Sequence, residues 1–394
     1  MTTPITVLLA AVEPSGDALG ASLYRFLKER LPDNTNFIGC GGIAMEAAGF
    51  SSAFSTDAFS VIGLTGFLKA IPEGMKRARE IGELAASNHA DIGVYIDGWA
   101  FSWRAARYTK LYSPNTLTVK YATPQVWASR PKRVERVREH FDSVLTLLPF
   151  EPAWFEAAGV RAEFVGNPNF QSVYEQNMDG INFIQQHGLQ DKKILIVLPG
   201  SRKSEVSQLA PVLNETISEL VTKHPDLAVI IPPAPSVRDF VKELLAPSKD
   251  QITYIEPEER FSAFNAATAA IAASGTVTTE LAIAGTPMIV AYKTDALTAL
   301  WAKSVVTTDY VTILNNAAGR EVIPEYLQED CTTEMVLPAI EALLSDEVER
   351  TRQKAAFGKL LEELEIDQAP AAEKAADAVL ELLRSNGRLN ADGD

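Results

Sequence analysis

The stretch ITVLLAAVEPSGDALGASL, residues 5–23, starts as a continuous apolar run and passes through a Pro-Ser-Gly turn into a helical pattern. The same succession returns in KILIVLPGSRKSEVSQL, residues 193–209. A continuous apolar run is typical of a strand buried on both faces of a parallel sheet. Because the helix N-terminus that follows such a strand favours anions, each stretch predicts an anion site. Two such stretches in 394 residues predict two similar α/β domains that face a shared cleft.

Strands alternate with helical patterns along both halves of the chain, which indicates doubly wound parallel sheets. In the first half we expect strands at 5–11, 36–40, 92–96, 117–122, 143–147 and 163–165. In the second half we expect them at 193–198, 227–231, 252–255, 270–273 and 287–292. The polar segment 166–190 predicts the junction. We therefore expect domains over 1–170 and 171–345, followed by C-terminal helices and a frayed tail over 346–394.

The net charge of −15 belongs entirely to the second half and the tail, because residues 1–170 carry 17 Lys/Arg and 17 Asp/Glu. This acidity argues against nucleic-acid binding by the whole chain. No apolar run approaches the roughly 18 residues of a membrane span, and we expect no signal peptide. Cys40 and Cys331 lie far apart and the four histidines are scattered, so we expect reduced thiols and no metal. GxGxxG is absent, and we expect no cofactor.

The strongest local signal is AASGTVTTELAIAGTPMIVAY, residues 272–292. A strand ends at Ala273, and Ser274, Gly275 and Thr276 form the turn into a helix. Free amides in this turn would bind a diphosphate, and Glu280, one helical turn later, could accept hydrogen bonds from two ribose hydroxyls. The alternative is a plain helix cap with a glutamate in the first turn.

Two further strand ends carry candidate residues. In LPGSR, residues 198–202, Gly200 and Ser201 form a turn and Arg202 suits a phosphate oxygen, unless it is a surface arginine paired with Glu205. In YIDGWAF, residues 95–101, Asp97 could act as a general base toward an acceptor hydroxyl. The alternative for Asp97 is a turn or cap residue.

Two segments of the first half could face an anionic membrane. The helical pattern in 121–140 is basic, and 57–79 mixes apolar residues with a closing basic cluster, so acyl chains are candidate ligands. The alternatives are a solvated helix face and a core-facing helix. The basic residues of the first segment are Arg130, Lys132, Arg133, Arg136 and Arg138.

Six motifs, in order, resemble lipid-A-disaccharide synthases and extend from about residue 7 to residue 344. They are VEPSGDALGASL (12–23), TPQVWASRPKRV (123–134), LLPFEP (147–152), LPGSRKSEV (198–206), ASGTVTTELAIAGTPMIVAY (273–292) and TDYVTILNNAAGREVIPEYLQED (308–330). The resemblance implies a GT-B fold, with two Rossmann-like domains facing a cleft and C-terminal helices that cross back to the first domain.

The resemblance also implies a reaction. The family transfers 2,3-diacylglucosamine from UDP to 2,3-diacylglucosamine 1-phosphate (lipid X), with inversion and without a catalytic metal. The product is the β-1,6-linked lipid A disaccharide 1-phosphate, an intermediate of lipopolysaccharide biosynthesis. The implied location is cytoplasmic, as a peripheral protein on the anionic inner membrane. The helical tail could exchange between the subunits of a homodimer.

By motif position, Asp97 matches the family's proposed base and Arg202 its phosphate-contacting arginine. The remaining matches are substrate-binding residues. They are Ser15, Gly16 and Asp17 in the first domain, and Gly200, Ser201, Ser274, Gly275, Thr276, Glu280, Asn315, Gly319, Arg320 and Glu321 in the second.

The departures from the family pattern lie in or near the first domain. Gly98-Trp99-Ala100 stands where the family usually has Ala-Pro-Asp, and Asn167 stands where it has a histidine. These changes keep alternatives open. One is a divergent paralogue that uses another acceptor, and another is a nucleotide-sugar-binding protein without turnover. The weakest is a UDP-sugar epimerase of the same fold.

Overall fold

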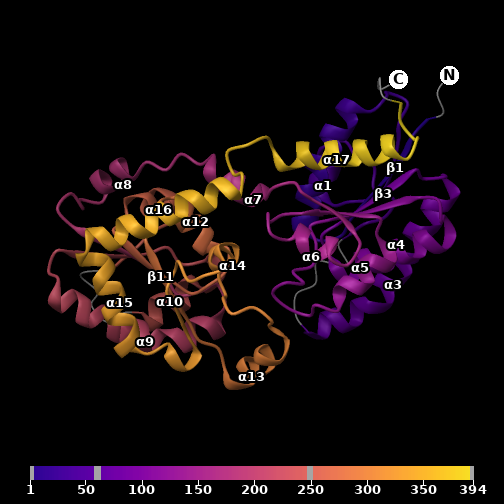
Figure 1. The fold of residues 1–394 in the computed structure, drawn as a ribbon. Coiled ribbons are helices and arrows are strands. Elements are labelled where there is room, and N and C mark those ends of the chain that lie inside the picture. Colours follow the sequence, from indigo (N-terminus) through magenta and orange to yellow (C-terminus); the bar gives the residue numbers. More distant parts are fainter. Residues whose placement is uncertain (1–3, 57–63, 246–251, 391–394) are drawn as a thin grey trace. The chain divides into compact units, whose positions relative to one another are not determined.

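The computed structural model describes residues 4–56, 64–245 and 252–390. These residues form two compact units. The first comprises the chain up to Pro168 together with the stretch from Gln368, and the second comprises Asn169–Asp367. Each unit contains one six-stranded sheet with helices packed on it (Figure 1).

The sheet of the first unit is parallel throughout, with the strand order β2-β1-β3-β4-β5-β6. Leu8 of β1 belongs to the apolar core on one face and Leu9 to the core on the other, and neither exposes any surface. Burial on both faces explains why this strand is a continuous apolar run. The strands are β1 (Thr6–Ala11), β2 (Asn36–Cys40), β3 (Ile92–Ile96), β4 (Leu117–Tyr121), β5 (Ser143–Thr146) and β6 (Arg161–Phe164).

The last helix of the chain, α17 (Ala371–Ser385), packs on α1 (Pro14–Arg30) in the first unit (Figure 1). Its buried face includes Ala375 and Leu383, and Arg30 pairs with Glu373 at 2.5 Å. The predicted return of C-terminal helices to the first domain is therefore confirmed for α17. The other helices of this unit are α2 (Ile43–Ala47), α3 (Leu64–Ser87), α4 (Trp99–Tyr112), α5 (Arg133–His140) and α6 (Pro152–Glu156).

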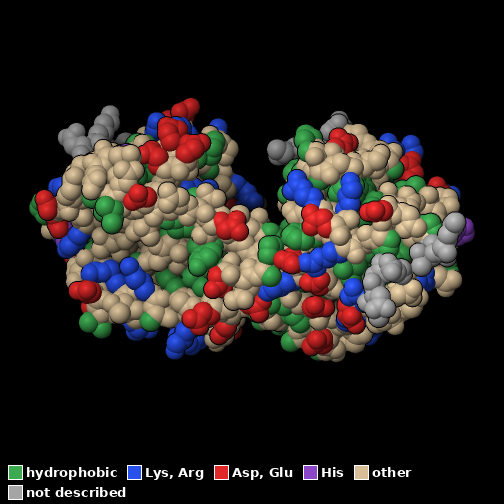
Figure 2. Space-filling view, turned by 90° about the horizontal axis from the view of Figure 1, so that it is seen from above, with side chains coloured by type: hydrophobic (Ala, Val, Ile, Leu, Met, Phe, Trp, Pro, Cys, Tyr) green, Lys and Arg blue, Asp and Glu red, His purple; other side chains and the backbone are tan. Residues whose placement is uncertain are grey.

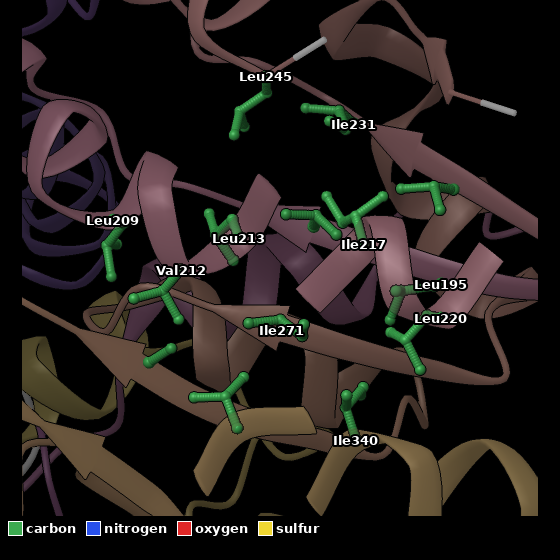
Figure 3. Packing of buried hydrophobic residues seen from close by; sticks show 14 of the residues in the cluster. Leu195, Leu209, Val212, Leu213, Ile217, Leu220, Ile231, Leu245, Ile271 and Ile340 are labelled. Atoms are coloured by element: carbon green, nitrogen blue, oxygen red, sulfur yellow. The ribbon is translucent and has the colours of Figure 1, made fainter. Parts of the chain in front are cut away.

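The second unit repeats the plan with the strand order β12-β11-β10-β7-β8-β9, again all parallel. Figure 3 shows Leu213, Ile217 and Leu220 of α9 (Lys203–Lys223) packed among buried side chains of the sheet, with Leu195 and Ile271 among them. These three residues recur every three or four positions, so they lie on one face of the helix. The strands are β7 (Lys193–Leu198), β8 (Leu227–Ile231), β9 (Ile252–Tyr254), β10 (Ala269–Ala272), β11 (Met288–Tyr292) and β12 (Glu325–Leu327).

Several shorter helices surround this sheet, and α16 follows α15 before the chain returns to the first unit. They are α7 (Pro168–Tyr174), α8 (Gly180–Gln186), α10 (Arg238–Leu244), α11 (Arg260–Ala266), α12 (Val277–Ile283), α13 (Ala296–Val305), α14 (Ile313–Ala318), α15 (Thr333–Ser345) and α16 (Glu347–Glu363).

All eleven predicted strands are present, with ends that differ by at most two residues. Strand β12 was not predicted, because its three half-buried residues form no apolar run. The division between the units falls after Pro168 and again after Asp367, so α16 lies in the second unit and only α17 in the first.

Acidic and basic side chains are interspersed on the face of the molecule seen in Figure 2. No helix in the described ranges is long and apolar enough to span a bilayer. Of the apolar segment expected at 57–79, residues 57–63 lie outside the described residues, and the remainder forms the start of α3.

Candidate functional site

A pocket of about 440 Å³ opens in the second unit at the carboxyl ends of its strands. The strand order reverses there, because β8 lies on one side of β7 and β10 on the other. Such a switch point is the usual ligand site of an open α/β sheet. The lining includes seven residues predicted from the sequence, namely Gly200, Ser201, Arg202, Ser274, Gly275, Thr276 and Glu280.

The turn between β10 and α12 presents its backbone to this pocket. Ser274 and Gly275 have φ of 94° and 98°, and the Thr278 hydroxyl fixes the turn by donating to the Gly275 carbonyl at 2.9 Å. In the described structure the amides of Ser274, Gly275 and Thr276 donate no hydrogen bond to the protein. A Cβ at Gly275 would meet no atom within 4 Å. The turn therefore offers unpaired donors beside open space, as an anion requires.

The turn between β7 and α9 is arranged differently. The Glu205 carboxylate accepts hydrogen bonds from the amides of Ser201 at 3.1 Å and Arg202 at 3.2 Å. Gly200 has φ of 104°, and a Cβ there would lie 2.7 Å from the same carboxylate. The protein's own carboxylate thus occupies these amides, so this turn can offer a ligand chiefly the Arg202 side chain.

Arg202 pairs with Glu205 at 3.0 Å, as the alternative interpretation of the sequence held, and it also lines the pocket. Its side chain is 77% exposed, and the one described hydrogen bond of its guanidinium is to Glu205. Since a guanidinium has five N–H donors, most of them remain open to a phosphate.

Glu280 and Arg260 form a second ion pair in the pocket, at 3.3 Å. Burial raises the pKa of Glu280, and the charge of Arg260 opposes that shift. Both residues also line an adjoining pocket of about 380 Å³ between α7 and α11. Arg260 could not be predicted as a site residue, because it begins a helix in a stretch without a recognisable motif.

The other predicted residues of the second unit do not line this pocket. Asn315 is fully buried, accepts hydrogen bonds from the amides of Val322 and Ile323 at 2.8 and 2.9 Å, and locks their loop. Gly319 ends α14 with φ of 61°. Arg320 and Glu321 are exposed beyond it.

Asp97 lies at the carboxyl edge of the first sheet, where the strand order reverses between β1 and β3. The Ser15 hydroxyl donates to its carboxylate at 2.5 Å. Asp97 and Gly98 both have left-handed backbones, with φ of 48° and 46°. Gly16 allows the start of α1 to approach, because a Cβ there would lie 3.0 Å from the Ile96 carbonyl. The structure thus brings Ser15, Gly16 and Asp97 together.

Asp17 does not join them as a free side chain. It is buried, and its carboxylate accepts hydrogen bonds from the amides of Gly42 and Ala44 at 2.7 Å and Met45 at 3.1 Å. We therefore assign Asp17 a structural role at the start of α2.

Two charged neighbours of Asp97 escaped the sequence analysis. Lys120 of β4 is fully buried, and its ammonium donates to the Asp97 carbonyl at 2.7 Å. Burial lowers the pKa of Lys120 to about 7, while Asp97 and Glu13 oppose that shift. Burial and the negative charge of Asp97 raise the pKa of Glu13. A lysine within the apolar stretch LTVKY was the available signal.

Within the described ranges, no group of three or more His, Cys, Asp or Glu side chains is arranged so that it could hold a metal ion. Both cysteines are free and buried.

Comparison with known proteins identifies the family. The model of the family described as lipid-A-disaccharide synthetase matches residues 7–379. The chain belongs to the lipid-A-disaccharide synthase family. The family's lipid-A-disaccharide synthase from Paramagnetospirillum magneticum is 37% identical over 381 residues, which cover 96% of this chain and 97% of the relative. That from Ruegeria pomeroyi is 37% identical over 386 residues, covering 96% and 95%. Lipid-A-disaccharide synthases are glycosyltransferases, and the chain is therefore an enzyme.

Solved structures show the fold. A putative UDP-N-acetylglucosamine 2-epimerase from Listeria monocytogenes superposes with a TM-score of 0.60 at 15% identity, covering 98% of this chain and 97% of its own. A glycosyltransferase from Rickettsia africae gives 0.57 at 12% identity, covering 97% and 99%. This chain thus has the GT-B fold expected from the sequence.

Proposed function

We propose that this enzyme transfers 2,3-diacylglucosamine from UDP to the 6-hydroxyl of lipid X, in a single displacement that inverts the anomeric carbon. The family assignment supports the reaction. The main structural support is that each sheet has a switch point with suitable groups. Asp97 lies at that of the first sheet, and unpaired amides and Arg202 lie at that of the second.

Asp97 acts as the general base. Its carboxylate lies at a strand end, half-buried, with the Ser15 hydroxyl as a donor on one oxygen. A base in this position accepts the proton of the acceptor hydroxyl as that oxygen attacks the anomeric carbon. The bond from the anomeric carbon to the UDP oxygen breaks on the opposite face, and UDP leaves as an anion.

The second unit binds the nucleotide. The amides of Ser274, Gly275 and Thr276 and the guanidinium of Arg202 contact the diphosphate, where they stabilise the charge that develops as UDP leaves. Glu280 accepts hydrogen bonds from the ribose hydroxyls. Burial raises its pKa, and the charge of the paired Arg260 opposes that shift.

The decisive experiment incubates the enzyme with UDP-diacylglucosamine and lipid X and identifies the product by mass spectrometry. We expect the disaccharide 1-phosphate from the wild type, and loss of about 10²–10⁴ in rate for Asp97→Asn. Asp33→Asn removes an exposed carboxylate of the same unit and serves as the control.

Each alternative gives a different result. A paralogue with another acceptor would not consume lipid X, but would transfer the donor sugar to a different hydroxyl compound. A binding protein would bind UDP in calorimetry without turnover. An epimerase would change the donor sugar with no acceptor present.

We also propose that the enzyme works as a peripheral protein at the cytoplasmic face of the inner membrane, through arginines of α4 and α5. Arg133 lies 5.9 Å from the Trp99 ring, and Arg104 and Arg136 lie 4.5 and 4.8 Å from the Trp103 ring. None of the three pairs with a carboxylate in the described structure. Burial and then the charge of Arg136 lower the pKa of Arg104. A surface of indoles and unpaired cations favours anionic head groups.

Co-sedimentation with phosphatidylglycerol vesicles tests this surface. We expect Arg104→Gln, Arg133→Gln and Arg136→Gln combined to abolish salt-sensitive binding, since each cation near such a surface contributes about 1 kcal/mol. A triple Gln variant at Arg25, Lys28 and Arg384, exposed in the same unit, is the control. Equal binding of both triple variants would remove the α4–α5 surface from the proposal.

A further inference from the structure

Lys120 lies beneath the turn that carries Asp97, and the proposed reaction does not use it. It is the fourth residue of β4 and exposes no surface. Its ammonium donates to the carbonyls of Asp97 at 2.7 Å, Tyr121 at 2.9 Å and Tyr95 at 3.2 Å. The three N–H donors of the ammonium therefore each have an acceptor.

A charge in this position is costly, because burial disfavours an ammonium and an apolar side chain would fill the same space. The adjacent position of β5 is Val144, which is fully buried. The cost appears in the pKa of Lys120, which burial lowers to about 7. A buried charge with specific charged partners near the carboxyl end of a strand is a candidate for a functional role.

The charged side chains that act on Lys120 are Glu13, after β1, and Asp97, after β3. From α4, the neutral hydroxyl of Ser102 donates to the Asp97 carbonyl at 2.5 Å. The two carboxylates repel each other, since Asp97 raises the pKa of Glu13, and Lys120 lowers it. The three groups therefore form one cluster in which a single cation offsets two anions.

We infer that Lys120 is a positioning residue for the base. It holds the left-handed turn of Asp97 and Gly98 through the Asp97 carbonyl, and its positive charge offsets the repulsion between the Asp97 and Glu13 carboxylates. The inference rests on the proposed role of Asp97. Without the ammonium, the negative charge of Glu13 would act on the Asp97 carboxylate without a nearby cation to offset it.

The test compares pH profiles of kcat/KM for Lys120→Gln, Lys120→Met and the wild type. Gln retains N–H donors for the carbonyls but loses the charge, so the acidic limb should move to higher pH by about one unit. Met also loses the donors, so its plateau rate should fall further. Calorimetric UDP binding should be unchanged, because that pocket lies in the second unit. Lys28→Gln, an exposed lysine of the first unit, is the control.

Glu13→Gln provides the opposite perturbation. The Glu13 carboxylate is partly desolvated, but the residue as a whole is exposed, so this variant should fold even if the Lys120 variants do not. Removing the neighbouring negative charge should move the acidic limb to lower pH.

If Lys120 had only a structural role, replacing it would lower the melting temperature and would lower the rate by the same factor at every pH. An unshifted limb in Lys120→Gln, or a limb in Glu13→Gln that stays in place, overturns the inference. Normal turnover by Asp97→Asn would instead remove the base itself, and with it the proposed function.

Discussion

Replacing Arg202 by alanine should separate nucleotide binding from folding. The side chain is 77% exposed, and its one described ion pair is with Glu205. Exposed pairs contribute about 0–1 kcal/mol, so the free energy of unfolding should change little. A charge-assisted hydrogen bond contributes about 1.5–3 kcal/mol, so loss of the phosphate contact should weaken UDP binding by about 10- to 150-fold. The transfer rate should fall by about 10²–10³, because the contact also stabilises the leaving diphosphate.

Calorimetry with UDP and the lipid X transfer assay measure these two effects, and a thermal melt checks folding. Lys203→Ala is the matched control, since Lys203 is the next residue, is exposed and does not line the pocket. Arg202→Lys should recover part of the affinity, because it keeps the charge and loses the planar fork. Unchanged UDP affinity and rate in Arg202→Ala would refute the assignment of the diphosphate to this pocket.

Three further perturbations test the fold around the site. Leu383→Ala should destabilise the first unit by about 2–5 kcal/mol in urea and leave UDP affinity unchanged; tryptophan fluorescence reports this, because four of the five tryptophans lie in that unit. Asp17→Ala should lower the free energy of unfolding by about 1–3 kcal/mol, because three amides lose their acceptor, and KM should not change. A raised KM with unchanged stability would instead indicate that Asp17 contacts the substrate. Burial raises the pKa of Glu151 from 4.5 to about 7, so its protonated form stabilises the native state below pH 4.5 and this contribution is lost as the pH rises through about 7. Relative to Glu151→Gln, the wild type should therefore lose up to about 1.4 kcal/mol per pH unit over that interval, and parallel stability curves would contradict it.

The sheets could be predicted from the sequence because their signal is local. Strands buried on both faces appear as continuous apolar runs, and the turns after β7 and β10 carry glycines at positive φ. The same locality explains why Arg202 and the 274–276 turn lie at one pocket, since the carboxyl ends of neighbouring parallel strands meet at one sheet edge.

The remaining features depend on contacts between distant residues. Asp17 precedes its three amide partners by 25 to 28 residues, so a motif could identify the residue but not its partners. The role of Lys120 depends on its hydrogen bonds to carbonyls that include one of a neighbouring strand, and the role of Arg260 depends on its ion pair with Glu280. Single-sequence patterns do not encode such approaches.

The position of α17 also has a consequence for biosynthesis. The first unit needs residues that precede the second unit in the sequence and residues that follow it, and Arg388, after α17, pairs with Asp91 at 2.9 Å. During translation, the second unit can assemble as soon as its own residues have left the ribosome. The first unit is completed only when α17 has also been synthesised, and until then the α1 surface that receives α17 is uncovered. Premature termination just before this helix would thus release a polypeptide whose later half is folded and whose earlier half exposes an apolar face, which makes it a substrate for chaperones and proteases.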